Sequence, residues 1–157
     1  ARGLPFTLAI TGQHPQLDLA AYGLDRYPQV RLDCPGRPDP FAHAAAVADA
    51  LATHAAAAEL VMVQGDTSSA LGGAIAGFET GTPVAHVEAG LRSHDKAMPW
   101  PEEDNRIAID SGAALLFAAT DLSAANLRAE GVSGDIHITG NTGIDALRER
   151  LGRVPVP

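Results

Sequence analysis

The sequence has 157 residues, of which 46% are hydrophobic and only 4% are aromatic. A chain of this length can bury a core in one domain, and its hydrophobic content excludes an intrinsically disordered protein. The formal net charge of −8 argues against general affinity for nucleic acids or anionic membranes.

Two further features bear on where such a protein works. Cys34 is the only cysteine, so an intrachain disulfide is impossible, which fits a reducing compartment. No apolar run approaches the roughly 20 residues needed to cross a bilayer, and the first residues lack the layout of a signal peptide. We therefore expect a soluble cytoplasmic protein that spans no membrane.

Short apolar runs alternate with helical patterns along the chain. In chain order the sequence predicts a strand at 7–10, a helix at 17–22, a strand at 30–34, a helix at 41–58, a strand at 60–63, a helix at 68–78, a strand at 84–87, a helix at 102–111, a strand at 114–118, a helix at 121–130, a strand at 136–138 and a helix at 143–151. Such alternation is typical of parallel βαβ units. The expected fold is therefore α/β, a Rossmann-like three-layer domain built on a parallel sheet.

Some residues inside these elements carry packing expectations. Gly72 and Gly73 each weaken the helix at 68–78 by about 1 kcal/mol relative to alanine. Because glycine has no Cβ, both positions permit close contact with the sheet or with a ligand. His86 lies inside a predicted strand, where we expect it to be buried and hydrogen-bonded.

Carboxylates follow two of the predicted strands, and a third stands in the loop beyond them. Asp66 comes after the strand at 60–63, Glu88 comes after the strand at 84–87, and Glu102 follows a proline-containing loop. Ligands of parallel α/β sheets bind beyond the carboxyl ends of the strands. Each carboxylate also has a simpler reading: Asp66 as a helix N-cap, Glu88 as a solvated loop residue and Glu102 as a first-turn helix residue.

The order and spacing of five motifs carry a resemblance to a known family. The motifs are Gly-Asp-Thr at 65–67, His-Val-Glu-Ala-Gly-Leu-Arg at 86–92, Pro-Trp-Pro-Glu-Glu at 99–103, Asn-Arg at 105–106, and Thr-Gly-Asn-Thr at 139–142 running into Ile-Asp-Ala-Leu at 144–147. Together they resemble the non-hydrolysing UDP-N-acetylglucosamine 2-epimerases.

The resemblance implies one half of a two-domain fold like that of the GT-B glycosyltransferases. Residues 1–142 match the Rossmann-like N-terminal domain, and residues 143–157 match the helix and tail that lead towards a second domain. The family's opening strand, with its Gly-Thr-Arg-Pro-Glu loop, has no counterpart before Thr7. The second domain, which in the family supplies a catalytic histidine, also has no counterpart here.

The resemblance also implies a reaction. The family eliminates UDP across C1–C2 of UDP-GlcNAc and adds it back with the opposite C2 configuration, giving UDP-ManNAc. Asp66, Glu88 and Glu102 match the family's catalytic acidic positions. Carboxylates can act there as the general acids and bases that the reaction needs. Arg92 and Arg106 are candidates for substrate binding, by holding phosphate or orienting those carboxylates, and equally for structural ion pairs.

The loop at 11–16 resembles another part of the family. Gln13, His14 and Gln16 match positions that help to form a second, allosteric UDP-GlcNAc site in bacterial members. The simpler alternative is an ordinary polar loop at the end of a strand.

The sequence contains no pattern for a cofactor. There is no Gly-x-Gly-x-x-Gly after a strand and no closed metal-ligand pattern, and the family uses neither NAD nor metal. The implied partners are UDP-GlcNAc and UDP-ManNAc and a second copy in a homodimer, and the implied setting is bacterial cell-surface polysaccharide synthesis. Two alternatives remain: a non-catalytic, stand-alone Rossmann-like domain that binds a sugar nucleotide or a protein, and the acceptor domain of a glycosyltransferase.

Overall fold

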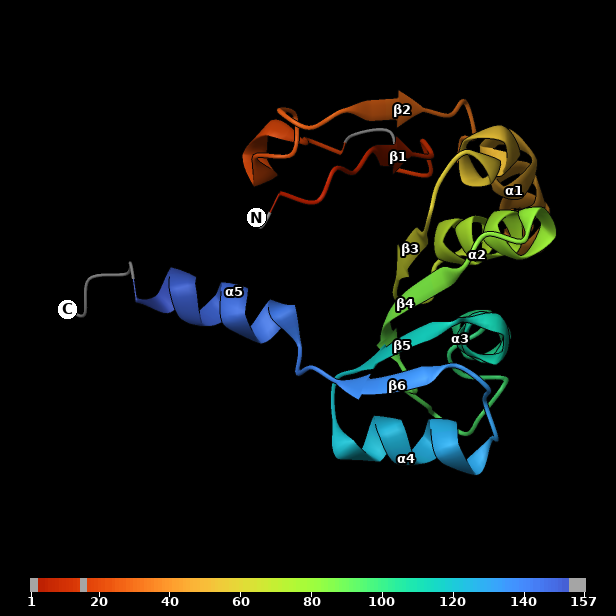
Figure 1. Ribbon diagram of the computed structural model, residues 1–157, viewed down its shortest axis with the longest axis vertical. Helices are drawn as coiled ribbons and strands as arrows, with labels where there is room; N and C mark the ends of the chain where they lie inside the picture. Colours follow the sequence, from red (N-terminus) through yellow and green to blue (C-terminus); the bar gives the residue numbers. More distant parts are fainter. Residues whose placement is uncertain (1–2, 15–16, 153–157) are drawn as a thin grey trace.

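A computed structural model describes residues 3–14 and 17–152 of the chain (Figure 1). Its elements are β1 (Leu8–Ile10), the 3-10 helix η1 (Ala20–Tyr22), β2 (Gln29–Arg31), α1 (Pro40–Ala56), β3 (Val61–Gln64), α2 (Ser68–Thr80), β4 (Val84–Ala89), α3 (Glu102–Gly112), β5 (Leu115–Ala118), α4 (Asp121–Ala129), β6 (Asp135–Ile138) and α5 (Thr142–Leu151). The predicted alternation of strands and helices is confirmed, element by element.

All strand pairs are parallel, as the alternation predicts, but the strands divide between two sheets. β1 pairs with β2, while β3, β4, β5 and β6 follow one another in a four-stranded sheet. The expected α/β class with parallel strands is confirmed, although the strands form two sheets and not one. Within the described residues, the chain leaves β2, passes through α1 and enters β3, which pairs with β4 and not with β1. The two sheets are therefore not hydrogen-bonded to each other.

The helix expected at 17–22 is a single 3-10 turn. The carboxylate of Asp18 accepts hydrogen bonds from the backbone N–H groups of Ala20 and Ala21, at 3.0 and 3.2 Å, and Gly23 ends the turn in the left-handed region at φ 63°. Short polar side chains that bond to nearby backbone groups favour turns over longer helices.

The longer helices begin where their capping residues predict. Asp39 caps α1 through Phe41 and Ala42, and Thr67 caps α2 through the N–H of Ala70. Helix α4 begins after Thr120, whose side chain accepts a hydrogen bond from the N–H of Ser123. Because Thr67 holds the N-cap position of α2, the reading of Asp66 as an N-cap is wrong.

Small residues let α2 pack closely on its neighbours, α1 and β3 (Figure 1). A Cβ at Gly72 would lie 2.6 Å from the carbonyl oxygen of Ala44 in α1, and one at Gly73 would lie 2.9 Å from Val63 in β3. The predicted close contact with the sheet is therefore confirmed at Gly73, and Gly72 approaches a helix instead.

The core lies between these elements, and α5 lies outside it. Ile109, Leu116 and Leu127 are the largest apolar side chains that are completely buried. Helix α5 projects away from the remainder of the described chain and buries none of its residues (Figure 1). Among the described residues, no helix combines the length and apolar content that a bilayer crossing requires.

Candidate active site

The carboxyl ends of β3 and β4 bring two of the predicted carboxylates together. Gly65 donates its N–H to the carbonyl of Val87 at 3.1 Å, so the Gly65–Asp66 loop lies beside Glu88. A register shift between Val87 and Ala89 places Glu88 at φ 75°, an unusual angle for a residue other than glycine. Its carboxylate is 3.4 Å from the side-chain amide of Gln64. Glu88 is thus part of a strand bulge and not of a solvated loop.

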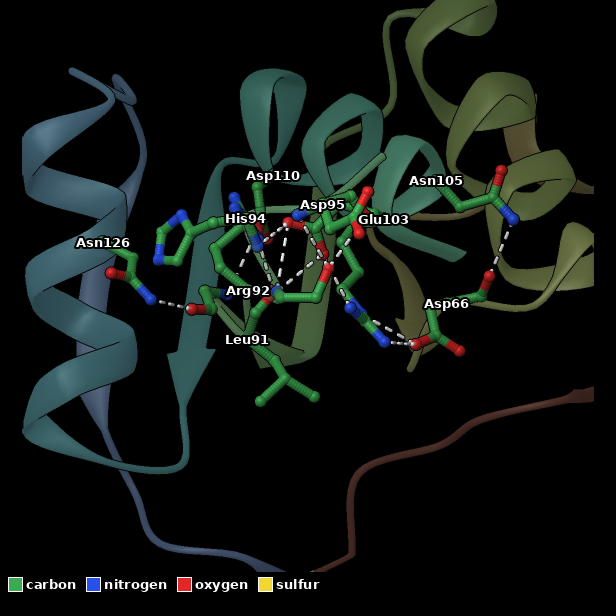
Figure 2. Close-up of polar contacts among 12 residues, drawn as sticks. Asp66, Leu91, Arg92, His94, Asp95, Glu103, Asn105, Asp110 and Asn126 are labelled. Carbon is green, nitrogen blue, oxygen red and sulfur yellow. Dashed lines mark hydrogen bonds and ion pairs between the residues drawn. The ribbon is translucent and has the colours of Figure 1, made fainter. Parts of the chain in front are cut away.

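Asp66 is held by two residues of helix α3 (Figure 2). Arg106 contacts its Oδ2 through Nε at 2.8 Å and through a terminal nitrogen at 2.7 Å. Asn105 donates its side-chain amide to the Asp66 carbonyl at 2.7 Å. These contacts fix both the backbone and the carboxylate of Asp66, which stays 26% exposed.

Glu103 supports this arrangement from inside the protein. It is 1% exposed and accepts hydrogen bonds from the backbone N–H groups of Ser93 and His94 and from Arg106 at 2.8 Å. Burial alone would raise the pKa of Glu103, but the hydrogen bonds from Ser93, His94 and Arg106 outweigh it, so the pKa lies below its ordinary value. Arg106 therefore bridges Asp66, one of the three predicted catalytic carboxylates, and Glu103, which was not among them.

Arg92 lies in a second, buried ion-pair network. Its guanidinium is 2.8 Å from Asp110 and 2.6 Å from Glu130, and its side chain is only 1% exposed. Desolvation would lower the pKa of Arg92, but its bonds to Glu130 and Asp110 raise it. These contacts correspond to the structural ion pair that the sequence left open as the alternative to substrate binding.

His86 joins this network to the Asp66 loop. Its Nδ1 is 2.6 Å from Asp110 and its Nε2 is 2.9 Å from the carbonyl oxygen of Gly65, and the residue is completely buried. Asp110 also accepts the N–H of Gly90. The expectation of a buried, hydrogen-bonded His86 is confirmed.

A cavity of about 350 Å³ opens beside Asp66. Its lining includes polar side chains and comes from the β1–η1 loop, the segment before α1, the β3–α2 loop and the N-terminal parts of α1, α2 and α3. The lining residues are Gln13, His14, Gly36, Arg37, Pro40, His43, Asp66, Thr67, Ser68, Pro101, Glu102 and Asn105. Its volume lies at the lower end of those typical of small-molecule sites.

The cavity gathers some of the predicted site residues and not others. Asp66 and Glu102 line it together with Gln13 and His14, whereas Gln16 lies outside the described residues. The described lining does not include Glu88, Arg92 or Arg106. Arg106 contacts the lining residue Asp66, Glu88 is bonded to Gln64, and Arg92 is held by Asp110 and Glu130.

Sequence reasoning missed four residues of this region. Glu103, Asn105 and Asp110 hold the loops; Glu103 and Asn105 stand in motifs that carried the resemblance but received no role, and Asp110 was not singled out. His43 is 1% exposed and lines the cavity, but a histidine in an alanine-rich helix gave no signal of its own. Among the described residues, no group of three or more His, Cys, Asp or Glu side chains is arranged to hold a metal ion.

Comparisons with known proteins agree with this geometry. A family model described as UDP-N-acetylglucosamine 2-epimerase matches residues 1–156. The UDP-N-acetylglucosamine 2-epimerase of Escherichia coli K12 is 48% identical over 90 residues, which are 57% of this chain and 24% of that protein. This chain thus matches only about a quarter of the length of such a relative.

Solved structures extend the match over more of the chain. The UDP-GlcNAc 2-epimerase of Neisseria meningitidis, solved bound to UDP-GlcNAc, superposes with a TM-score of 0.83 at 29% identity and covers 98% of this chain and 43% of that chain. The Methanocaldococcus jannaschii UDP-GlcNAc 2-epimerase, in complex with UDP-GlcNAc and UDP, gives a TM-score of 0.77 at 33% identity over 86% of this chain and 37% of that chain. The chain belongs to the UDP-N-acetylglucosamine 2-epimerase family.

Proposed function

We propose that this chain supplies the acid–base carboxylates of a UDP-N-acetylglucosamine 2-epimerase, which interconverts UDP-GlcNAc and UDP-ManNAc. One observation carries the proposal: Asp66 and Glu102 line the same cavity, and Glu88 lies beside the loop that holds Asp66. Three carboxylates around one site suit a reaction that takes a proton from one face of C2 and returns it to the other.

The proposed reaction has two halves. A carboxylate removes the C2 proton, the electron pair of the C2–H bond forms a C1–C2 double bond, and the C1–O bond breaks so that UDP leaves with the electrons of that bond. UDP then adds back to C1, and a carboxylic acid delivers a proton to the opposite face of C2. The atoms balance without an oxidant or a metal, because the proton and UDP both return.

The contacts distinguish the carboxylates in this scheme. Asp66 is fixed by Arg106 on one oxygen, whereas Oε2 of Glu102 is buried with no hydrogen-bond partner among the described residues. We therefore assign proton transfer at C2 first to Glu102, with Asp66 as the oriented second group. Glu88, two residues beyond His86, lies beside the loop that holds Asp66 and is given no separate proton-transfer step. We assign Arg92 a structural role, because its ion pairs are buried and lie apart from the cavity lining.

A chimera tests this assignment. The segment of the E. coli relative that aligns with this chain is replaced by the corresponding residues, and proton NMR in D2O follows UDP-GlcNAc. We expect deuterium at C2 and formation of UDP-ManNAc, with Glu102→Gln lowering the rate by about 10²- to 10⁴-fold. The matched control Glu79→Gln changes an exposed residue of α2 and leaves the rate unaltered. A folded chimera that binds UDP-GlcNAc without exchanging the C2 proton would refute the proposal.

The setting of the activity belongs to the same proposal. A homodimer is supported by the resemblance and by the apolar side chains that α5 exposes, namely Ile144, Leu147 and Leu151, which are 51–61% exposed. Multi-angle light scattering at increasing concentrations tests it, since a strict monomer would count against it. We also propose a bacterial, cytoplasmic role in supplying precursors for cell-surface polysaccharides. The carboxylates at the cavity favour the epimerase over a non-catalytic domain.

A further inference from the structure

Two buried polar atoms in the described part of the chain have no hydrogen-bond partner. They are Nδ1 of His43 and Oε2 of Glu102, and both residues line the cavity beside Asp66. A buried polar atom without a partner is costly, so native proteins rarely retain one without a reason. Two such atoms around one cavity suggest that a ligand completes their hydrogen bonds.

The tautomer of His43 follows from its other neighbour. The hydroxyl of Ser69 donates its only proton to Oε1 of Gln13, at 2.5 Å. Ser69 Oγ must therefore accept from Nε2 of His43, at 3.2 Å, and from the hydroxyl of Thr11, at 2.9 Å. In its neutral form the ring therefore carries its proton on Nε2, and Nδ1 is an acceptor.

His43 and Glu102 line the cavity, and their two unpartnered atoms are acceptors that a ligand with donors would satisfy. The lone pair of His43 Nδ1 and the carboxylate of Glu102 would both repel a phosphate oxygen. Hydroxyl and amide N–H groups, by contrast, match both atoms. We propose that His43 is a sugar-recognition residue: its Nδ1, together with Glu102, accepts hydrogen bonds from the hydroxyl or amide donors of a hexosamine ring.

This inference rests on the proposed function for the identity of the sugar and adds a residue to its site. Other ionisable groups lining the cavity are His14, Arg37 and Asp66. Arg37 is the cation among them that remains for the acidic part of a sugar nucleotide. His43 would then bind the sugar, while Arg37 and other groups bind the nucleotide.

NMR of the chain with ¹⁵N-labelled histidine tests the tautomer and the contact separately. Without ligand, we expect His43 to be protonated on Nε2 only. Adding N-acetylglucosamine or UDP-GlcNAc should shift the Nδ1 resonance, whereas UDP alone should leave it in place. A proton on Nδ1 in the free chain would overturn the proposal. So would an equal shift with UDP alone, or no response to either sugar at tens of millimolar.

Variants separate recognition from folding. His43→Gln retains an amide that can donate to Ser69 but lacks an atom at Nδ1, so sugar affinity should fall roughly 3- to 10-fold, the value of one hydrogen bond. The matched control His54→Gln changes an exposed histidine of the same helix and should leave affinity unchanged. Equal affinity for His43→Gln and wild type, with unchanged melting temperatures, would overturn the inference.

Failure of this inference is distinguishable from failure of the proposed function. Sugar-dependent shifts at His43 without C2 exchange in the chimera would support sugar recognition and refute the epimerase assignment. Deuterium exchange at C2 without a shift of the His43 Nδ1 resonance would support the epimerase assignment and refute sugar recognition by His43.

Discussion

The most severe perturbation predicted by the structure is loss of the carboxylate of Asp110. This side chain is completely buried and accepts from three donors: His86 at 2.6 Å, Arg92 at 2.8 Å and the N–H of Gly90 at 3.0 Å. Asp110→Asn keeps the volume but offers one acceptor oxygen and turns an NH₂ group towards the remaining donors. Breaking a buried ion pair on one side costs about 3–5 kcal/mol.

Urea denaturation followed by circular dichroism measures this cost. A loss of at least about 3 kcal/mol is expected for Asp110→Asn, a large part of the 5–15 kcal/mol typical of a domain, with an unchanged slope against urea. The matched control is Glu130→Gln, which removes the other carboxylate from Arg92. Because Glu130 is 35% exposed, its loss should cost about 1 kcal/mol or less. A cost for Asp110→Asn no greater than that of the control would refute the reasoning.

Three further predictions concern stability. The pKa of Glu103 is lowered in the folded state, so ionised Glu103 contributes to the free energy of unfolding above its ordinary pKa of 4.5, and this contribution is lost as pH falls through the lower folded value. The urea midpoints of Glu103→Gln and wild type should therefore converge on acidification. A difference between them that stays constant with pH would contradict this. Gly72→Ala forces a Cβ to within 2.6 Å of the backbone oxygen of Ala44 and should cost about 1–3 kcal/mol, seen as a lower melting temperature. Leu127→Ala in the core should cost about 2–5 kcal/mol, while Leu147→Ala on exposed α5 should stay within about 0.5 kcal/mol; similar costs for the two would show that α5 is packed.

Local patterns in the sequence predict most of the fold. Short apolar runs alternate with longer helical stretches, and capping residues such as Asp39 and Thr120 mark where helices begin. The division of the strands between two sheets does not follow from such patterns, because pairing depends on how the crossover through α1 places β3. The position of α5 outside the core could not be predicted either, since its apolar stripe resembles that of a packed helix.

The candidate site was only partly predictable, for a similar reason. Asp66 and Glu88 follow the predicted strands, so their meeting at the carboxyl end of the sheet is a consequence of parallel topology. The partner of Asp66 is Arg106, 40 residues away, and only the fold shows that pairing. The positive φ of Glu88 comes from a bulge that no residue type announced.

Helix α3 explains why the hydrophobic pattern gave so little warning of these contacts. Glu103, Arg106 and Asp110 are spaced three and four residues apart, so they share one face of the helix. That face is buried, yet it consists of charged groups whose partners come from the loops after β3 and β4. A periodicity analysis assigns a charged face to solvent, whereas here the face fastens both loops to one rigid helix. The same helix begins with Glu102, which lines the cavity and whose Oε2 has no hydrogen-bond partner among the described residues. Positioning of the loops and placement of the proposed proton-transfer group thus depend on a single element.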